Sequence, residues 1–269
     1  MSRYIRQETL NGFGESGQYN LTNAHILVIG AGGLGSALLP LLGAAGVGKI
    51  TIVDHDEVSI SNLHRQVLHT EEGAANLVNK AESAAARLKA INSEITCFTV
   101  KEPFTSNNAF DLAKGKDLII DASDNVYTRY LANDAAINAS RESGKKIPLV
   151  LGAALRFDGQ VSVWNTENGP CYRCVYPRPP KAQAVGTALT KGAFGPAVAI
   201  TGSHMASEAI KLLVYGKDKT LAGKLLVIDE LGNNYRVANL RPQQKTCCCC
   251  DSSLPLPDLP MDYPNQPKF

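Results

Sequence analysis

A glycine-rich turn between an apolar run and a helical pattern constrains the fold of this chain more than any other feature. Residues 25–29 form the apolar run, Gly-Ala-Gly-Gly-Leu-Gly follows at 30–35, and the helical pattern covers 34–45. A strand, a glycine turn and a helix N-terminus together form a cradle for phosphate. Backbone N–H groups converge there, the helix dipole is positive, and the missing Cβ atoms let the backbone approach the anion. The sequence therefore predicts a nucleotide-binding βα unit that uses Gly30, Gly32, Gly33 and Gly35.

The first half of the chain continues as alternating strands and helices. Strands are predicted at 24–30, 49–54, 95–100, 117–121 and 148–153, and the intervening helices at 34–45, 76–92, 110–113 and 126–143. Leu77, Ala81, Ala84 and Leu88 share the predicted apolar face of the helix over 76–92. This alternation is typical of a parallel, doubly wound sheet.

The pattern changes in the second half. A strand at 159–164 alternates polar and apolar residues, a helix is predicted over 196–214, and the strands at 225–228 and 235–240 read as a hairpin. We therefore expect a doubly wound, Rossmann-like mixed α/β sheet, parallel in its N-terminal half and antiparallel in its C-terminal strands. Residues 1–250 are predicted to form the domain, and the proline-rich residues 251–269 a C-terminal tail.

Composition excludes several classes of protein. The 269 residues, 44% hydrophobic, suffice for one large α/β domain or two small ones. Basic residues are mixed with acidic ones at a net charge of +2, so no nucleic-acid binding is expected. The N-terminus lacks the apolar stretch of a signal peptide, and the richest apolar segment is too short to span a bilayer. We expect a cytoplasmic protein without a membrane segment.

Polar residues after the second predicted strand suit a bound nucleotide. Asp54 comes 24 residues after the first glycine of the turn, where an acidic side chain can accept hydrogen bonds from ribose hydroxyls. Asn62 and Arg65 are suited to holding a triphosphate, because the guanidinium offers a planar fork to phosphate oxygens. Lys80 begins the next helix, within reach of the same phosphates. A solvated charged turn is the alternative interpretation for Arg65 and Lys80.

The run Asp-Ala-Ser-Asp-Asn at 121–125 ends the fourth predicted strand. Asp124 would lie near a triphosphate there, and its carboxylate is a natural ligand for magnesium. Asp124 or Asn125 also suits the N-cap of the helix that follows. The two roles are compatible.

Six of the seven cysteines lie in two clusters. Two Cys-x-x-Cys pairs supply the four thiolates of a tetrahedral, structural zinc site: Cys171, Cys174, Cys247 and Cys250. Only Cys247 with Cys250 has the two-residue spacing in the second cluster, so Cys248 and Cys249 are expected to be bystanders. A redox pair or disulfides are the alternative. The five histidines are scattered, and none is predicted to be catalytic.

Taken in order, these motifs and the opening Arg3-Tyr4-x-Arg6-Gln7 resemble the ThiF/MoeB/HesA family, bacterial relatives of ubiquitin-activating enzymes, over residues 3–250. The resemblance implies ATP-dependent adenylation of the C-terminal glycine of a ubiquitin-like sulfur carrier that ends in Gly-Gly, with release of pyrophosphate. The implied pathways are thiamine, molybdopterin or related biosynthesis. The implied contacts are ATP on the turn at 30–35 with Asn125, ribose on Asp54, phosphates on Asn62, Arg65 and Lys80, and magnesium on Asp124.

The resemblance also implies a homodimer in which Arg6 reaches the neighbouring subunit's site. The loop at 175–195 resembles the crossover segment over which the carrier tail threads. Many relatives carry a cysteine in that loop, whereas this chain has none between 175 and 246. A thioester on this chain is therefore not expected. No rhodanese domain follows Cys250, so a separate sulfur donor is expected.

Two other functions fit parts of the pattern. A non-catalytic scaffold that binds the carrier would keep the same fold. A nicotinamide-dependent oxidoreductase would explain the turn and Asp54, but it leaves Arg65, Lys80 and the cysteine pairs without a role.

Overall fold

The fold is built on an eight-stranded mixed sheet with the order β3-β2-β1-β4-β5-β6-β7-β8. The computed structural model describes residues 2–180, 191–251 and 253–254. The strands are β1 (His25–Ile29), β2 (Lys49–Val53), β3 (Thr96–Val100), β4 (Leu118–Asp121), β5 (Leu149–Leu155), β6 (Asp158–Trp164), β7 (Lys224–Asp229) and β8 (Asn234–Asn239). The first five pair in parallel, and β6, β7 and β8 join antiparallel. The predicted fold class is confirmed.

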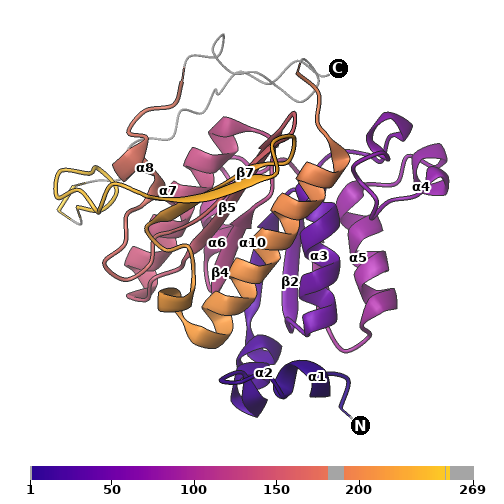
Figure 1. Cartoon of the computed structure of the whole chain (residues 1–269), viewed down its shortest axis with the longest axis horizontal. Helices are drawn as coiled ribbons and strands as arrows, with labels where there is room; N and C mark the ends of the chain where they lie inside the picture. Colours follow the sequence, from indigo (N-terminus) through magenta and orange to yellow (C-terminus); the bar gives the residue numbers. More distant parts are fainter. Residues whose placement is uncertain (1, 181–190, 252, 255–269) are drawn as a thin grey trace.

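Helices cover both faces of this sheet (Figure 1). The longer ones are α2 (Gly14–Asn23), α3 (Gly33–Ala45), α5 (Lys80–Ile91), α7 (Val126–Ser143) and α10 (Gly195–Tyr215); the short ones are α1 (Ile5–Glu8), α4 (Glu71–Ala75), α6 (Ala109–Ala113), α8 (Tyr172–Val175), η1 (Ile60–Asn62) and η3 (Lys217–Lys219). The helices α3, α5 and α10 pack on one face, and α6 and α7 on the other. The parallel strands are therefore buried on both sides, as their continuous apolar runs require.

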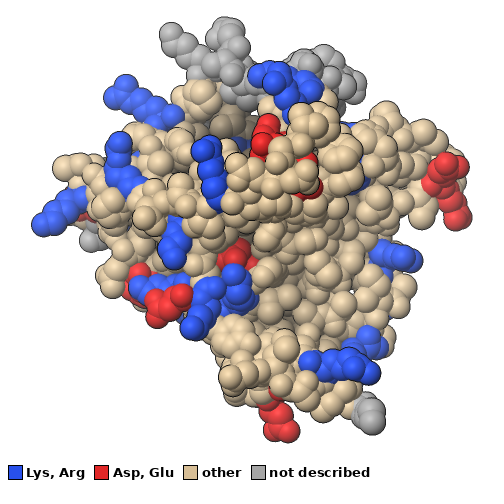
Figure 2. Space-filling model, viewed as in Figure 1, with Lys and Arg blue, Asp and Glu red and all other residues tan. Residues whose placement is uncertain are grey.

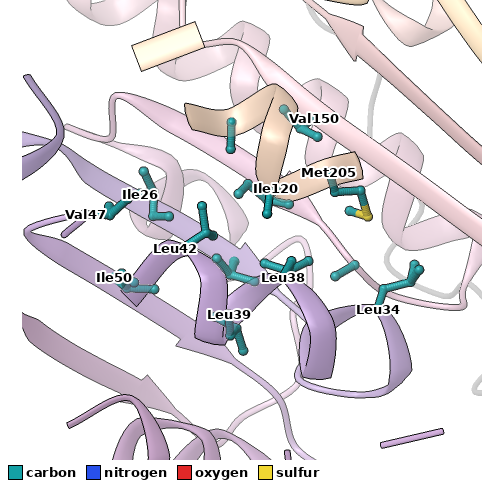
Figure 3. Close-up of a cluster of buried hydrophobic side chains, with 14 of the residues drawn as sticks. Ile26, Leu34, Leu38, Leu39, Leu42, Val47, Ile50, Ile120, Val150 and Met205 are labelled. Atoms are coloured by element: carbon teal, nitrogen blue, oxygen red, sulfur yellow. The ribbon is translucent and has the colours of Figure 1, made fainter. Parts of the chain in front are cut away.

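The larger core lies between the sheet and α3 with α10 (Figure 3). Leu38 and Leu42 of α3 meet Ile26 of β1 and Ile120 of β4 there, and all four side chains are fully buried. The two helices touch through their backbones, because a Cβ at Gly202 of α10 would lie 2.6 Å from the Leu34 carbonyl oxygen. This close packing sets α10 directly against the start of α3, and hence against the glycine turn.

The structure corrects the start of one predicted helix and adds helices that were not predicted. The helix predicted over 76–92 begins only at Lys80, and Leu77 has a φ of +50° and is 64% exposed instead of facing the core. Asn79 is the cause: its Oδ1 accepts hydrogen bonds from the N–H groups of Ala81 and Glu82 and starts the helix there. The N-terminal helices α1 and α2 and the short α8, just before the loop at 175–195, were not predicted. The pattern missed α1 because this helix buries no residue.

Two other predicted segments fall partly outside the described residues. The loop at 175–195 includes 181–190, and the tail at 251–269 includes 252 and 255–269. The start of the tail is attached to α7, where the Arg141 guanidinium donates hydrogen bonds to the carbonyl oxygens of Cys249, Asp251 and Leu254. The division into a domain and a tail stays a prediction.

Basic residues are dispersed over the face shown in Figure 2 and do not form one continuous stripe, in keeping with the small net charge. Within the described part of the chain, none of the helices has the length and apolarity to cross a membrane.

Candidate functional site

The carboxyl edge of the parallel strands forms the candidate nucleotide site. The chain runs from β1 outward to β2 and β3, then returns to place β4 on the other side of β1. The loops after β1 and β4 therefore leave the edge in opposite directions. Open α/β sheets bind ligands in the crevice at such a switch point. The glycine turn follows β1, and the run at 121–125 follows β4.

The glycines of the turn are required by packing as well as by ligand access. Gly30 has a φ of +97°, and a Cβ there would lie 2.9 Å from the carbonyl oxygen of Ala122. A Cβ at Gly33 would lie 2.7 Å from a methyl carbon of Val198 on α10, and one at Gly35 2.6 Å from the Gly30 oxygen. No hydrogen bond among the described residues uses the N–H groups of Gly32 and Gly33. These two donors are free to meet an anion.

Asp54 is anchored against this turn. Its Oδ2 accepts a hydrogen bond of 2.7 Å from the Ala31 N–H, and its Oδ1 accepts one of 3.0 Å from the Asp56 N–H. Burial raises the pKa of Asp54, against the opposing effects of the Lys80 charge and the two hydrogen bonds. Each carboxylate oxygen keeps a second lone pair. Asp54 thus lies beside the turn, where a ribose hydroxyl could still donate to it.

Arg65 and Asn62 lie together beside the turn. The Arg65 Nη2 donates to Asn62 Oδ1 at 2.7 Å, and a Cβ on Gly33 would be 3.7 Å from Arg65 Cγ. Arg65 is half-buried, and Gln66 next to it is buried beside Gly32. The Gln66 Oε1 has no hydrogen-bond partner among the described residues. Gln66 was not predicted to belong to the site.

Lys80 reaches the carboxyl end of β2, as expected, but an acidic side chain holds it there. Its Nζ is 2.8 Å from Asp56 Oδ2, and only 6% of the Lys80 side chain is exposed. Burial by itself would raise the pKa of Asp56, but the hydrogen bond and the charge of Lys80 outweigh it and lower this pKa. The ammonium group is therefore fixed near the turn before any phosphate arrives.

The loop after β4 combines a helix cap with an exposed carboxylate. Asn125 is the N-cap of α7, since its Oδ1 accepts a hydrogen bond of 2.9 Å from the Tyr127 N–H. Asp124 is exposed at the same edge of the sheet. Of the two candidates for the cap, the structure thus selects Asn125 and leaves the Asp124 carboxylate to the solvent.

Asp121, the last residue of β4, is a buried carboxyl that sequence reasoning did not select. Burial raises its pKa to about 6, although the charge of Arg129 and hydrogen bonds from Ser123 oppose this. Its Oδ2 has no partner in the described part of the chain. An acidic residue that ends an otherwise apolar strand was the signal that could have found it.

Arg6 lies away from these residues in its own chain. It is exposed on α1, which packs near the other end of the sheet, at the bottom of Figure 1. Its neighbours Tyr4 and Gln7 touch the C-terminal end of α3, at Gly46 and Ala45. The structure therefore brings together the turn, Asp54, Asn62, Arg65 and Lys80 on one chain, but not Arg6.

The four predicted thiolates converge in a second site. The Sγ atoms of the four cysteines all lie within 4.8 Å of one another. Cys171 Sγ is 3.9 Å from Cys174 Sγ and 3.6 Å from Cys247 Sγ, and Cys174 Sγ is 3.5 Å from Cys250 Sγ. Hydrogen bonds from Cys171 and Cys250, with one from the Gln244 N–H, lower the pKa of Cys174. The same contacts raise the pKa values of Cys171 and Cys250, so the lowered pKa belongs to Cys174 alone.

A buried ion pair supports this cysteine cluster. The Arg173 guanidinium, between Cys171 and Cys174, donates to both carboxylate oxygens of Asp134 on α7 at 2.8 and 2.6 Å. Cys249 was expected to be a bystander, but its side chain is buried and its thiol donates to Asp134 Oδ1 at 3.3 Å. It cannot serve as a fourth ligand at the Cys-x-x-Cys spacing, yet it belongs to the packing beneath the cluster.

Comparisons with known proteins agree with this fold and these motifs. The model of the ThiF family matches residues 4–249. A sulfur carrier protein adenylyltransferase of Thermus thermophilus is 43% identical over 93% of this chain and 91% of the relative. The adenylyltransferase and sulfurtransferase MOCS3 of mouse is also 43% identical, over 92% of this chain and 52% of its own length. The chain spans between about half and 60% of the MOCS3 relatives it matches.

Solved structures show the same architecture. Escherichia coli MccB with ATP superposes with a TM-score of 0.78 at 20% identity, over 93% of this chain and 74% of the MccB chain. At that identity the likeness concerns the fold alone. The family match over nearly the whole chain, together with a close relative matched almost end to end, shows that the chain belongs to the ThiF family.

Proposed function

We propose that this protein is an ATP-dependent adenylyltransferase that activates the C-terminal glycine carboxylate of a ubiquitin-like sulfur carrier. One observation carries the proposal: the free N–H groups of the glycine turn, the Arg65 guanidinium and the Asp54 carboxylate meet at the switch point of the sheet. Donors for phosphate and an acceptor for ribose are thus combined, as a nucleoside triphosphate requires. The name of the Thermus relative supports a sulfur carrier as the second substrate.

The proposed reaction needs positioning and charge neutralisation rather than a covalent intermediate. A carboxylate oxygen of the carrier attacks the α-phosphorus of ATP, the bond to pyrophosphate breaks, and a mixed anhydride with AMP forms. The carboxylate is already ionised at pH 7, so no general base is required. Arg65 and Lys80 would neutralise phosphate charge, and Asn62 would orient Arg65 through their 2.7 Å hydrogen bond. Asn125 would border the nucleotide while its Oδ1 caps α7.

Magnesium fits the exposed carboxylate of Asp124, because hard divalent cations prefer oxygen ligands and keep several waters. When bound, it would offset the charge of the departing pyrophosphate. We assign Asp124 alone to this role.

Zinc fits the cysteine cluster. Thiolates at about 2.3 Å from a tetrahedral zinc ion lie roughly 3.8 Å from one another, and the Sγ atoms that contact here lie 3.5–3.9 Å apart. Cys171, Cys174, Cys247 and Cys250 would fill all four positions, so the ion would be structural. It would join α8 to the segment that precedes the C-terminal tail.

We further propose that the working unit is a homodimer in which Arg6 completes the site of its neighbour. Within one chain, Arg6 lies on α1 at the end of the sheet remote from the glycine turn, and β1 separates the two by about 16 Å. Mixed Arg6→Ala and Asp124→Ala subunits should regain part of the activity that each homodimer lacks, because one of the two hybrid sites is intact. Mixing two Arg6→Ala preparations is the control, and no recovery after verified subunit exchange would place Arg6 outside the neighbour's site.

The absence of cysteine between 175 and 246 supports adenylation without a thioester on this chain, with sulfur supplied by a separate donor. A cytoplasmic site of action fits both that chemistry and the reduced thiols the cluster requires.

Pyrophosphate exchange tests the proposed function. Purified protein, Mg-ATP, labelled pyrophosphate and a carrier ending in Gly-Gly should yield labelled ATP. The same carrier without its last glycine should yield none. Tight carrier binding with no exchange would instead establish a non-catalytic scaffold.

A further inference from the structure

His69 is buried between the glycine turn and helix α5. Only 6% of its surface is exposed. Its Nε2 lies 2.8 Å from the carbonyl oxygen of Ala31, within the turn, and its Nδ1 lies 2.9 Å from Ser83 Oγ on α5. This side chain is therefore wedged between two elements that the proposed reaction uses: the turn, and the helix that begins with Lys80.

The surroundings of His69 determine its tautomer. A carbonyl oxygen can only accept, so the proton lies on Nε2 and Nδ1 accepts from the Ser83 hydroxyl. Burial lowers the pKa of His69 and the charge of Lys80 lowers it further, while the Ala31 hydrogen bond and Asp54 oppose them. In this tautomer the imidazole has one donor and one acceptor, and both are engaged.

The hydrogen bond from His69 to Ala31 also sets the direction of an N–H group of the turn that could donate to a phosphate. In a trans peptide the C=O and the following N–H point in opposite directions. Because His69 holds the oxygen of Ala31, the N–H of Gly32 is directed away from His69, and it is one of the two donors left without a partner. Asp54 holds the N–H of Ala31 at the same time. Both peptide groups of Ala31 are thus fixed before a ligand arrives.

We propose that His69 is a positioning residue for nucleotide binding: it holds the Ala31 carbonyl so that the Gly32 N–H faces the phosphates, and it joins the turn to α5 through Ser83. The inference rests on the proposed nucleotide site. His69 would touch neither the nucleotide nor the carrier. Its contribution should appear in the affinity for ATP and be absent from the affinity for the carrier.

Two amide substitutions of His69, by Gln and by Asn, separate this positioning role from simple packing. Gln at position 69 carries its amide nitrogen near the place of Nε2 and can still donate to Ala31, whereas Asn is too short. We expect His69→Gln to bind Mg-ATP within about threefold of the unchanged protein, and His69→Asn to bind on the order of tenfold more weakly, because the buried Ala31 oxygen loses its donor. Isothermal titration of each full-length protein with Mg-ATP, and separately with the carrier, provides the measurement.

His25 supplies a matched control. It is also partly buried and its Nε2 lies 2.9 Å from a hydroxyl, that of Thr51, but it is the first residue of β1, at the opposite end of the strand from the turn. His25→Asn should leave the ATP affinity unchanged, with any loss confined to thermal stability.

The outcomes are distinguishable. If the unchanged protein binds no ATP, the proposed function is wrong. If it binds ATP and His69→Asn binds as tightly as His69→Gln, the role of His69 is wrong although the site stands. Equal loss in His69→Asn and His25→Asn would also overturn it, because that result reports general destabilisation.

Discussion

Two regions differ in how completely their polar groups are paired: the carboxyl edge of the parallel strands, which forms the candidate nucleotide site, and the surroundings of the cysteine cluster. At the edge, the N–H groups of Gly32 and Gly33 and the Oδ2 of Asp121 have no partner among the described residues. Around the cluster, Asp134 and Arg173 bind each other through two hydrogen bonds at 2.8 and 2.6 Å. Buried polar groups cost free energy unless they are paired. The unpaired groups at the edge therefore lower the stability of the protein but remain available to a ligand. Around the cluster, Asp134 and Arg173 are already paired with each other.

The largest expected effect comes from a substitution in the cysteine cluster. Cys174→Ser should lose the bound zinc and lower the free energy of unfolding by several kcal/mol, because structural zinc sites contribute roughly 10–16 kcal/mol of apparent binding energy in small peptides. Metal analysis and thermal unfolding, on protein purified without chelator, provide the measurements. Cys248→Ser is the matched control: it should keep one zinc per chain, because its partly exposed Sγ lies outside the four-thiolate set. Zinc retained at full occupancy in Cys174→Ser would refute the assignment.

A substitution at the candidate nucleotide site should change the activity of the protein more than its stability. Arg65→Ala should slow pyrophosphate exchange by about 10²–10³, by analogy with the loss of one charge-stabilising donor from an active site. Its melting temperature should change little, because Arg65 is only half-buried. Lys114→Ala removes an exposed cation paired with Glu142 on another part of the surface, and it should leave the exchange rate unchanged. If Arg65→Ala exchanges pyrophosphate at the full rate, Arg65 belongs to a solvated charged turn, which was the alternative interpretation.

The smallest effect concerns the unpaired carboxyl of Asp121. Its folded pKa of about 6 exceeds its ordinary 3.8, so the folded state binds the proton more tightly. The contribution of Asp121 to the free energy of unfolding is fully present below pH 4. It falls as the pH rises through 6, by up to about 3 kcal/mol in total. Asp121→Asn stays neutral and keeps an acceptor for Ser123. Its stability relative to the unchanged protein should therefore rise between pH 4.5 and 7.5, as urea unfolding at both values would measure. A constant difference would mean that Asp121 is ionised throughout.

The prediction succeeded where a local pattern has one structural outcome. The apolar run at 25–29 and the glycines after it led to β1, the turn and α3, because only a buried strand and a helix N-terminus suit those residues. The four thiolates of the cluster were found from spacing alone. The start of α5 was misplaced by four residues, because a cap at Asn79 depends on its contacts as well as on the apolar period.

Groups that act through distant partners were not predictable in this way. His69 had no motif to mark it, and its role depends on Ala31, 38 residues away, and on Ser83. Likewise, Cys249 was set aside as a bystander because nothing in its spacing points to Asp134 on α7. Such contacts join positions that the sequence does not relate.

The sequence by itself determined the class of sheet, the glycine turn, the set of clustered cysteines and the family, because each depends on residue types at short and regular spacings. Only the tertiary structure decided which polar groups are left without partners. Asp54 and His69 are brought to the two sides of Ala31 by β2 and by the segment before α5, while Arg6 is carried to the far end of the sheet. Hydrogen bonds act over about 3 Å. Whether a donor meets its acceptor is therefore settled by the packing of whole elements and cannot be read from the order of residues.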